Sequence, residues 1–509
     1  MALGALARRD SAGGSDAVAS AEPYGPALYD DLITRRALPL ILIVAAAVRL
    51  LGIHFSLWLD ESASLAFARQ PLSHLWGEWM LRETNPPLFY TLLKGWQELG
   101  GTSDAVARLL PIAIGLGGVV GLFLLAGAIA GSRGGLLAAA LLALSAMHVD
   151  YSLQLRGYGL AHCAVVFACL GMVRFLQDRT RRWLWLYLAG AAVAVYSHTT
   201  LLLFVGLANL TMVALLRRDR PALGAWLIAN MALAAIAGWW LWMTFRQLAQ
   251  PQNFGWIATP SLADAWRMTS DVFVPMYLRS CTLGGSLMLC AIVVGVVLFS
   301  LARSRPEVTL LAVLALGAPL LLYMVSQKTA IFLPRTLFWA SGPLIALLAA
   351  GVVSLADKRT AFLLGGVLLA FSAVGLASWL PDGETEQWAA SARAADGMPG
   401  AHDIFVADDA VALALGHYLP DAERRIVVVT EPGAAHERWA VGLFKGRHLA
   451  PATAQRLFRE QCHVVGVRRG YLDPSTMLRT AGGRATPIDT GAANPQVAAW
   501  DFDVCAAAR

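Results

Sequence analysis

The chain has 509 residues, of which 57% are hydrophobic and only 15% are charged. Its mean hydropathy of +0.57 is too high for a chain that must bury its apolar side chains in a water-soluble core, so the composition excludes a soluble globular protein. The net charge of +6 would suit a nucleic-acid-binding protein, but the Lys and Arg residues stand in short clusters between apolar runs. We therefore expect a membrane bilayer around this chain and no nucleic-acid partner.

The N-terminal residues differ from those that follow. Residues 1–34 are rich in Ala, Gly and Ser without apolar periodicity, which predicts a disordered cytoplasmic tail. Residues 35–380 consist mainly of apolar runs, and about eleven of these are long enough to span a bilayer. The stretch 86–99 is too short and too polar to span, which predicts a helix lying at the membrane interface. The predicted spans are 38–57, 106–130, 134–149, 158–176, 183–198, 200–216, 222–243, 281–301, 308–326, 336–355 and 361–380.

The basic residues predict the orientation of these helices. Arg and Lys gather in alternate loops between the spans, and such loops face the cytoplasm in most membrane proteins. The N-terminus is then inside, and the first outer loop is 58–105. The long loop 244–280 and all residues after 380 also lie outside. Aromatic residues in loop 244–280 suit either interfacial anchors or the lining of a groove for a lipid.

Residues 381–509 have the pattern of a soluble domain. The segments "DIFVAD", "RIVVVT" and "HVVGVRR" predict buried strands, whereas "AVALALGHYL" and "PATAQRLFREQ" predict amphipathic helices. The sequence therefore predicts a small extracytoplasmic α/β domain, with acceptor binding or a lid as its expected role. The domain contains Cys462 and Cys505. An oxidising compartment would allow a disulfide between them, and the sequence leaves open whether it forms.

An acidic pair, Asp60 and Glu61, follows the first predicted span directly. Charged residues beside a membrane helix are costly unless they face water or a partner, so the pair is a candidate functional site. The alternative is that it caps the helix predicted in "ESASLAFARQ". Arg156, His198 and Arg335 also fall at outer ends of predicted helices. A carboxylate among such cations suits a general base working beside an anionic leaving group.

Several motifs resemble one family when they are taken in order. The chain is similar to the bacterial polytopic glycosyltransferases of the GT-C type, in the branch related to protein O-mannosyltransferases and to the aminoarabinose transferases that modify lipid A. The resemblance covers roughly residues 38–350, and the Asp-Glu pair is its most specific element. The motifs that carry it are "LWLDESASLAFARQPL", "NPPLFYTLLKGW", "ARLLPIAIGLGGVVGLFLLA", "HVDYSLQLRGYGLAH", "AVYSHTTLLLF" and "LPRTLFWASGPLIALLAAG".

The resemblance implies an enzyme of the inner bacterial membrane whose active site faces the periplasm. Such enzymes transfer a hexosyl or pentosyl group, with inversion, from a polyprenyl-phosphate donor to an acceptor hydroxyl in cell-envelope glycan, glycolipid or glycoprotein synthesis. The family base maps to Asp60, and the arginines that bind the donor phosphate map to Arg335 and Arg156. For each arginine, snorkelling to the lipid headgroups is the alternative. His198 either contacts the phosphate or acceptor, or is a structural donor at a helix end.

The remaining implied roles concern the acceptor and a metal. Glu61 would orient the acceptor, or hold a divalent metal in branches that use one. Relatives commonly carry Gln-Glu-Ala-Arg where this chain has Gln154 in the acidic position, which leaves Asp150 as the substitute carboxylate. Asn85 replaces a common His, and the sequence offers no dense carboxylate cluster. The sequence therefore leaves open whether a divalent metal binds. The expected acceptor is a lipid, polysaccharide or protein. A membrane transporter or flippase of lipid-linked saccharides is the alternative.

Overall fold

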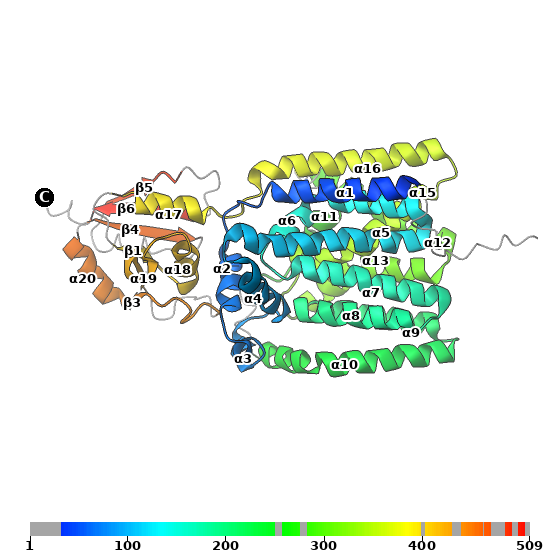
Figure 1. The fold of residues 1–509 in the computed structure, drawn as a ribbon, viewed down its shortest axis with the longest axis horizontal. Coiled ribbons are helices and arrows are strands. Elements are labelled where there is room, and N and C mark those ends of the chain that lie inside the picture. Colours follow the sequence, from blue (N-terminus) through cyan, green and yellow to red (C-terminus); the bar gives the residue numbers. More distant parts are fainter. Residues whose placement is uncertain are drawn as a thin grey trace, which may run out of the picture.

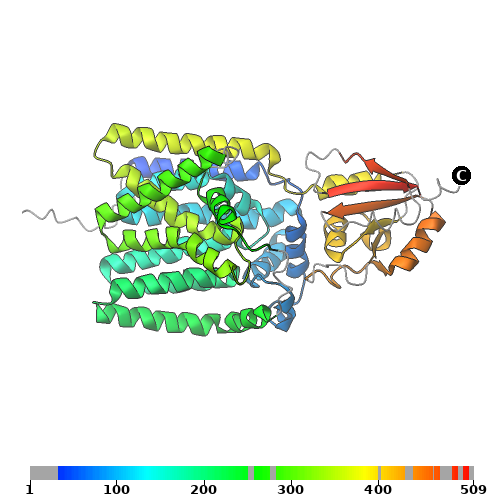
Figure 2. The ribbon, with the colours of Figure 1, turned by 180° about the vertical axis from the view of Figure 1, so that it is seen from behind.

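The computed structural model of the protein describes a helical bundle with a smaller sheet domain at one end (Figures 1 and 2). The predicted tail 1–34 falls almost entirely outside the described residues, and Cys462 and Cys505 lie outside them as well. The described residues are 32–249, 257–274, 282–398, 403–429, 439–461, 463–469, 484–490 and 497–503.

The bundle consists of long apolar helices. Seven stretches in the described part of the chain are long and apolar enough to cross a bilayer, so the chain is a multi-span membrane protein. They are Asp104–Ala143, Tyr158–Asp178, Arg220–Leu248, Leu283–Arg303, Pro306–Ser326, Pro334–Val353 and Lys358–Trp379. The long elements are α1 (Leu32–Leu50), α5 (Asp104–Ala143), α7 (Tyr158–Asp178), α8 (Arg182–Ser197), α9 (Leu201–Leu216), α10 (Arg220–Leu248), α12 (Thr282–Arg303), α13 (Pro306–Ser326), α15 (Ser341–Val353) and α16 (Lys358–Trp379).

Element α5 contains the predicted span 106–130 and the first part of the predicted span 134–149, which ends inside α6 because the helix breaks after Ala143. The backbone leaves the helical region at Gly131, whose φ of 71° suits glycine. A Cβ built on Gly135 would lie 2.6 Å from the carbonyl oxygen of Phe123, although residues twelve apart in a straight helix are separated by about 18 Å. The chain therefore reverses at Gly131, and α5 is two helical arms packed against each other, as the two separate runs predict.

Short helices occupy the end of the bundle that adjoins the sheet domain (Figure 1). The predicted first outer loop folds into four of them, and the predicted interfacial helix 86–99 corresponds to α4. The short elements are α2 (Leu59–Ala68), α3 (Leu72–Leu75), η2 (Glu78–Arg82), α4 (Leu88–Gly100), α6 (Ala146–Leu153), α11 (Leu262–Phe273), α14 (Pro334–Leu337), η5 (Phe338–Ala340) and η6 (Leu380–Asp382).

The C-terminal domain is a six-stranded sheet with helices, in the strand order β3-β2-β1-β4-β6-β5. Strands β1, β2, β3 and β4 pair in parallel, and β6 pairs antiparallel with both β4 and β5. The three predicted strands are β1, β2 and β4 at its centre. The strands are β1 (Ile404–Val406), β2 (Ile426–Val429), β3 (Arg447–Leu449), β4 (His463–Arg469), β5 (Arg484–Ile488) and β6 (Val497–Asp503), and the helices are α17 (Trp388–Asp396), α18 (Asp409–Gly416), α19 (Ala422–Arg425) and α20 (Pro451–Gln461).

Together these elements confirm the predicted fold class, a polytopic helical membrane domain followed by a C-terminal α/β domain. Helix α16 ends at Trp379, and the predicted C-terminal domain, residues 381–509, has α17 at Trp388 as its first α-helix. Helix α2 packs against α4 on the side of the bundle and against α18 of the C-terminal domain. The acidic pair in the first turn of α2 therefore lies where the two parts of the protein meet.

Candidate functional site

The two carboxylates of the acidic pair have different surroundings. Glu61 is 1% exposed, and its Oε2 accepts a hydrogen bond of 3.1 Å from the backbone N–H of Trp58, which closes the first turn of α2. Asp60, one residue earlier, keeps 22% of its side chain exposed. The helix-capping role that the sequence leaves open for the pair therefore belongs to Glu61, whereas the carboxylate of Asp60 remains accessible.

Glu61 is fixed by the membrane bundle. Its two oxygens accept hydrogen bonds of 2.9 and 3.0 Å from the two Nη atoms of Arg108, and Oε1 also accepts one of 2.8 Å from the backbone N–H of Leu155. Both partners of the ion pair are nearly inaccessible, with side chains 3% and 1% exposed. Such a bidentate pair combines charge with fixed geometry. The structure thus makes Glu61 the link between α2, α5 and the segment after α6.

Asp60 faces two arginines from distant parts of the chain. Its Oδ2 lies 3.7 Å from Nη1 of Arg335 and 3.9 Å from Nη2 of Arg156. Both distances are too long for hydrogen bonds, but they are short enough for strong attraction between opposite charges. The structure therefore brings together Asp60, Arg156 and Arg335, three of the residues that the sequence singles out.

Arg156 is held firmly in this cluster. It is 6% exposed, and its Nη1 donates to the carbonyl oxygen of Asp60 at 3.3 Å and to the hydroxyl of Tyr90 at 3.2 Å. Arg335 lies in α14 at the start of a spanning stretch and keeps 24% of its side chain exposed. A buried, multiply bonded Arg156 is not a snorkelling side chain, and Arg335 is the more exposed of the two cations.

A further buried carboxylate, Glu83, completes the cluster. Its Oε1 accepts hydrogen bonds of 2.9 and 2.6 Å from the backbone and side-chain N–H groups of Asn85, and lies 4.0 Å from Nη2 of Arg156. Burial raises the pKa of Glu83 above its usual range, although the charge of Arg156 and the bonds from Asn85 oppose the rise. Asn85 thus orients Glu83 through both its backbone and its side-chain N–H groups.

His198 and Asp150 lie in more ordinary surroundings. Nδ1 of His198 lies 2.9 Å from the hydroxyl of Thr200, just beyond the end of α8, and the charges of Arg335 and Arg156 act on its ring, so both predicted roles stay open. Asp150 accepts a hydrogen bond of 3.0 Å from the side chain of Gln154 within the turn that follows α6. The structure gives neither residue a contact with the carboxylate of Asp60 among the interactions described.

The donor set does not fit the divalent metal that some relatives use. Both oxygens of Glu61 are occupied by N–H donors, so they offer no free position to a cation. Within the described ranges, no three His, Cys, Asp or Glu side chains stand close enough together to hold a metal ion. Glu61, one of the two residues considered for a metal, therefore has no lone pair left for it in this arrangement.

Two members of the cluster were not predicted from sequence. Arg108 lies inside the predicted span 106–130, and a charge within an apolar helix was the signal that could have revealed it. Glu83 stands in the polar stretch "RETNPP", where nothing distinguishes it from a solvent-exposed residue. Both become visible only when the tertiary partners Glu61 and Arg156 are known.

The raised pKa of Glu83 predicts how the activity changes when the pH is lowered. As the pH falls, Glu83 should take up a proton at a pH above the ordinary glutamate pKa of about 4.3. The neighbouring arginines then lose a negative counter-charge. We expect activity to fall in that window, and Glu83→Gln to move the fall to lower pH while reducing the maximum. Measuring kcat/KM against pH for both proteins tests this, and superimposable profiles would contradict it.

The sign of the stability effect separates this from acid unfolding. Because the folded state holds the proton of Glu83 more tightly than the unfolded chain, the contribution of Glu83 to the free energy of unfolding rises as the pH falls through the raised pKa. Thermal unfolding measured over the same pH range should therefore show no loss of stability from this group while activity declines.

Comparisons with known proteins agree with this architecture. The sequence model of the family described as dolichyl-phosphate-mannose-protein mannosyltransferase matches residues 84–242. The structure of ArnT from Cupriavidus metallidurans in the apo state matches with a TM-score of 0.59 and 14% identity, over 91% of this chain and 97% of that one. The structure of the same protein bound to undecaprenyl phosphate matches with a TM-score of 0.58, 14% identity and the same coverage. No curated protein sequence matches the chain.

The chain is thus a membrane protein with the fold of the GT-C glycosyltransferases, and the predicted resemblance is confirmed. It is mannosyltransferase-like over residues 84–242, and its fold is similar to that of ArnT over 91% of the chain. The matched family segment contains Arg108 and Arg156, whereas Asp60 and Arg335 lie on either side of it.

Proposed function

We propose that the protein is an inverting glycosyltransferase that moves a hexosyl or pentosyl group from a polyprenyl-phosphate donor to an acceptor hydroxyl outside the cytoplasm. The observation that carries this proposal is the partly exposed carboxylate of Asp60, which faces two arginines without hydrogen bonding to either. The ArnT structure with bound undecaprenyl phosphate shows that this fold accommodates such a lipid in a relative.

The geometry divides the reaction between base and cations. Asp60 takes the proton of the acceptor hydroxyl while the acceptor oxygen forms its bond to the anomeric carbon of the sugar. The bond from that carbon to the phosphate oxygen breaks, and the lipid phosphate leaves with the electron pair. Arg335, with Arg156 behind it, stabilises the negative charge of the leaving phosphate. Glu61 takes no part in the chemistry, since its oxygens are engaged in holding α2.

An apolar cavity in the bundle supports a lipid-linked donor. Its volume is about 80 Å³, and it is bounded by α5, α6, α11, α12, α15 and α16. Phe338 contributes to its lining and stands three residues after Arg335 in the chain. The cavity therefore offers apolar walls to a short piece of a polyprenyl chain.

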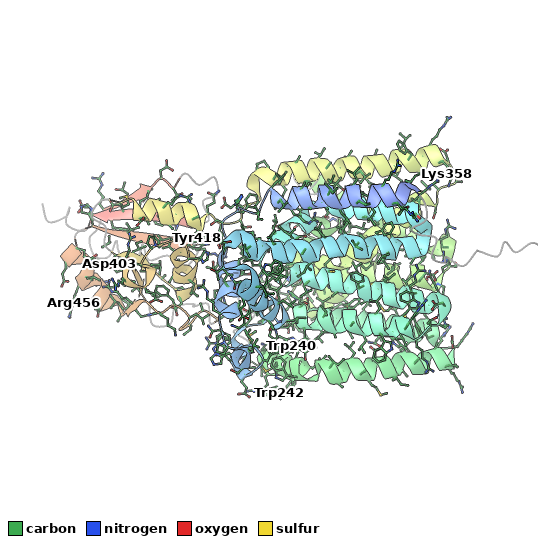
Figure 3. The ribbon with its side chains drawn as sticks, viewed as in Figure 1. Trp240, Trp242, Lys358, Asp403, Tyr418 and Arg456 are labelled. Atoms are coloured by element: carbon green, nitrogen blue, oxygen red, sulfur yellow. The ribbon has the colours of Figure 1, made fainter. Side chains whose placement is uncertain are left out.

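The positions of basic residues support an active site outside the cytoplasm. Lys358 lies at the end of the bundle that is far from the sheet domain (Figure 3). Arg179, which follows α7, donates a hydrogen bond to Asp219, which precedes α10. Loops rich in Lys and Arg face the cytoplasm. The cluster around Asp60 then lies on the periplasmic side of an inner membrane, together with the C-terminal domain. A lipid, polysaccharide or protein acceptor would approach from there.

A comparison of envelope glycans tests the proposal directly. Mass spectrometry of lipids and glycans from the native host, with and without the gene for this chain, should show the loss of one defined sugar together with accumulation of its polyprenyl-phosphate form. Unchanged glycans in the deletion strain would contradict the proposal. Purified protein that moves lipid-linked saccharides across vesicle membranes, without transferring sugar, would instead favour the transporter.

Arg335 should govern the affinity for the donor phosphate. We expect Arg335→Met to weaken binding of undecaprenyl phosphate by about 10- to 100-fold, because a charge-assisted bond to phosphate is lost. Arg335→Lys should retain part of the affinity as a point charge without the planar fork. Binding of the lipid to purified protein can be followed by isothermal titration calorimetry. The exposed Arg267 in α11, whose side chain is 65% accessible, provides the control Arg267→Met, and equal affinities of the two Met variants would contradict this role.

A further inference from the structure

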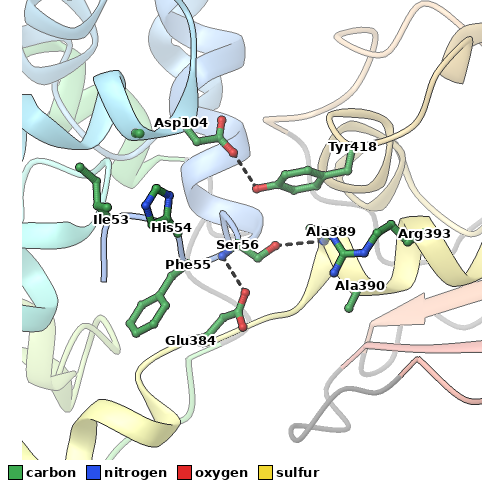
Figure 4. Close-up of a pocket in the computed structure, with 11 residues that line it drawn as sticks. Ile53, His54, Phe55, Ser56, Asp104, Glu384, Ala389, Ala390, Arg393 and Tyr418 are labelled. Carbon is green, nitrogen blue, oxygen red and sulfur yellow. Dashed lines mark hydrogen bonds between the residues drawn. The ribbon is translucent and has the colours of Figure 1, made fainter. Parts of the chain in front are cut away.

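The C-terminal domain binds the backbone that leads directly to Asp60. The N–H of Ser56 donates to Oε1 of Glu384 at 2.7 Å, and the N–H of Leu57 donates to the hydroxyl of Tyr418 at 2.8 Å. The hydroxyl of Ser56 accepts a bond of 3.0 Å from the N–H of Ala389 in return. Figure 4 shows the bonds of Ser56 at the junction of the two parts of the protein. The segment before α2 is thus held by side chains more than 300 residues later in the chain.

The bond nearest to Asp60 comes from Glu386. Its Oε2 accepts a hydrogen bond of 2.8 Å from the N–H of Leu59, the residue immediately before Asp60. The same oxygen accepts from Nε1 of Trp388 at 2.7 Å, and Oε1 accepts from Nε of Arg469 in β4 at 2.7 Å. Glu386 is 1% exposed, so its orientation is fixed by these three donors. A carboxylate at the start of α2 also interacts favourably with the helix dipole.

The side chain of Leu59 belongs to the core of the C-terminal domain. Leu59 is 1% exposed and lies in one buried cluster with Trp388, Ile404 and Val411, whereas the neighbouring residues of α2 pack with the bundle. In an α2 of ten residues, the first is therefore anchored in the C-terminal domain through both its backbone N–H and its side chain.

Asp60 lies between two anchors that belong to different parts of the protein. Leu59 before it is held by Glu386, and Glu61 after it is held by Arg108 and Leu155 of the bundle. We infer that the C-terminal domain is a positioning element for the proposed base, with Glu386 as the positioning residue. This inference rests on the proposed function of Asp60 and deepens it.

Further bonds and one cavity share this junction. The hydroxyl of Tyr418 donates to Asp104 at 2.9 Å, and Nε2 of His417 lies 2.7 Å from the same carboxylate. A cavity of about 390 Å³ lies beside these bonds, lined by residues that include His54 and Arg393 (Figure 4). Among the bonds across the junction, that of Glu386 to Leu59 acts on the residue next to Asp60. A displacement of a reacting group by about 1 Å can cost roughly 100-fold in rate.

Hydrogen exchange tests the positioning without relying on activity. Full-length protein in lipid nanodiscs is compared as wild type, Glu386→Ala and Glu386→Gln. In Glu386→Ala we expect the amides of residues 57–61 to exchange about tenfold faster, because the bond to the N–H of Leu59 is lost. Glu386→Gln retains an acceptor oxygen for that N–H and should restore part of the protection.

Asp403 supplies the matched control. It is a carboxylate of the same domain, 4% exposed, and accepts hydrogen bonds from Arg447 and Gln461 at 2.5 and 2.6 Å. Figure 3 shows it in the sheet domain away from the bundle. Asp403→Ala should leave the exchange of residues 57–61 unchanged, because it removes buried bonds of that domain without touching α2.

Kinetics separate positioning from general damage. In Glu386→Ala we expect kcat to fall about 100-fold while KM for the donor stays within about twofold, with partial rescue in Glu386→Gln. Unchanged exchange at residues 57–61 in Glu386→Ala, or the same change in Asp403→Ala, overturns the inference. A wild-type protein that transfers no sugar overturns the proposed function instead, and the exchange measurement still decides whether the C-terminal domain holds α2.

Discussion

Asp60→Asn should abolish sugar transfer while the protein still folds and binds its donor. Asparagine has nearly the same size, but it cannot accept the proton of the acceptor hydroxyl, so we expect a loss of about 10²- to 10⁴-fold in kcat. Folding should be preserved because the side chain of Asp60 is partly exposed and lies 3.7 and 3.9 Å from its two arginines, beyond hydrogen-bond distance. Turnover of a radiolabelled polyprenyl-phosphate sugar by purified protein measures the effect.

A nearby carboxylate provides the control for this experiment. Glu78 in η2 is 68% exposed and pairs with Arg246 on the outside of the cluster. Glu78→Gln should leave turnover and donor binding unchanged. Near-normal turnover in Asp60→Asn would remove Asp60 as the base, and a loss of donor binding equal to the loss of turnover would assign it to binding.

Arg108→Met should be the most destabilising single change in the cluster. It would leave the buried carboxylate of Glu61 without its cationic partner, which costs about 3–5 kcal/mol in free energy of unfolding. The double variant Arg108→Met with Glu61→Leu should recover part of this loss, because no charge is then buried alone. Recovery should be incomplete, since the N–H groups of Trp58 and Leu155 lose their acceptor.

Unfolding of the purified protein in mixed micelles with increasing dodecyl sulfate measures these differences. The exposed pair Arg267 and Asp264 on α11 serves for comparison, and Arg267→Met should leave the unfolding curve unchanged. A double variant that is no more stable than Arg108→Met would show that Arg108 acts through its packing or its bonds to backbone carbonyls, and would contradict the charge argument.

Some strands of the C-terminal domain could be predicted from the sequence, and others could not. Strands β1, β2 and β4 were predictable because each is a nearly continuous apolar run, as expected of strands buried on both faces. Strands β5 and β6 were not predicted, since "RATPI" contains a proline and "VAAWDFD" alternates poorly. Their places in the sheet follow from the pairing of β6 with β4 and of β5 with β6, which leaves β5 at the edge and which no local pattern reveals.

The candidate site likewise contains residues that the sequence revealed and residues that only the tertiary structure revealed. Asp60, Arg156 and Arg335 were found because charged residues at the ends of apolar helices are conspicuous, and the structure brings these three side chains together. Sequence alone could not separate the roles of Asp60 and Glu61, because their difference depends on Arg108 and Leu155. Glu386 stands in the polar stretch "DGETEQW", which has the composition of a linker, so its bond to Leu59 required the tertiary structure.

The bond between Leu59 and Glu386 can form only after both residues have been synthesised. The two residues are 327 positions apart, so at ribosomal rates of 5–20 residues per second they are synthesised about 15–65 seconds apart. Throughout that interval the segment around Asp60 has already left the ribosome but lacks its partner. The surroundings of Asp60 can therefore be completed only after the segment that carries Glu386 has been made and has reached α2. A chain that terminates before Glu386 would lack this restraint on Asp60.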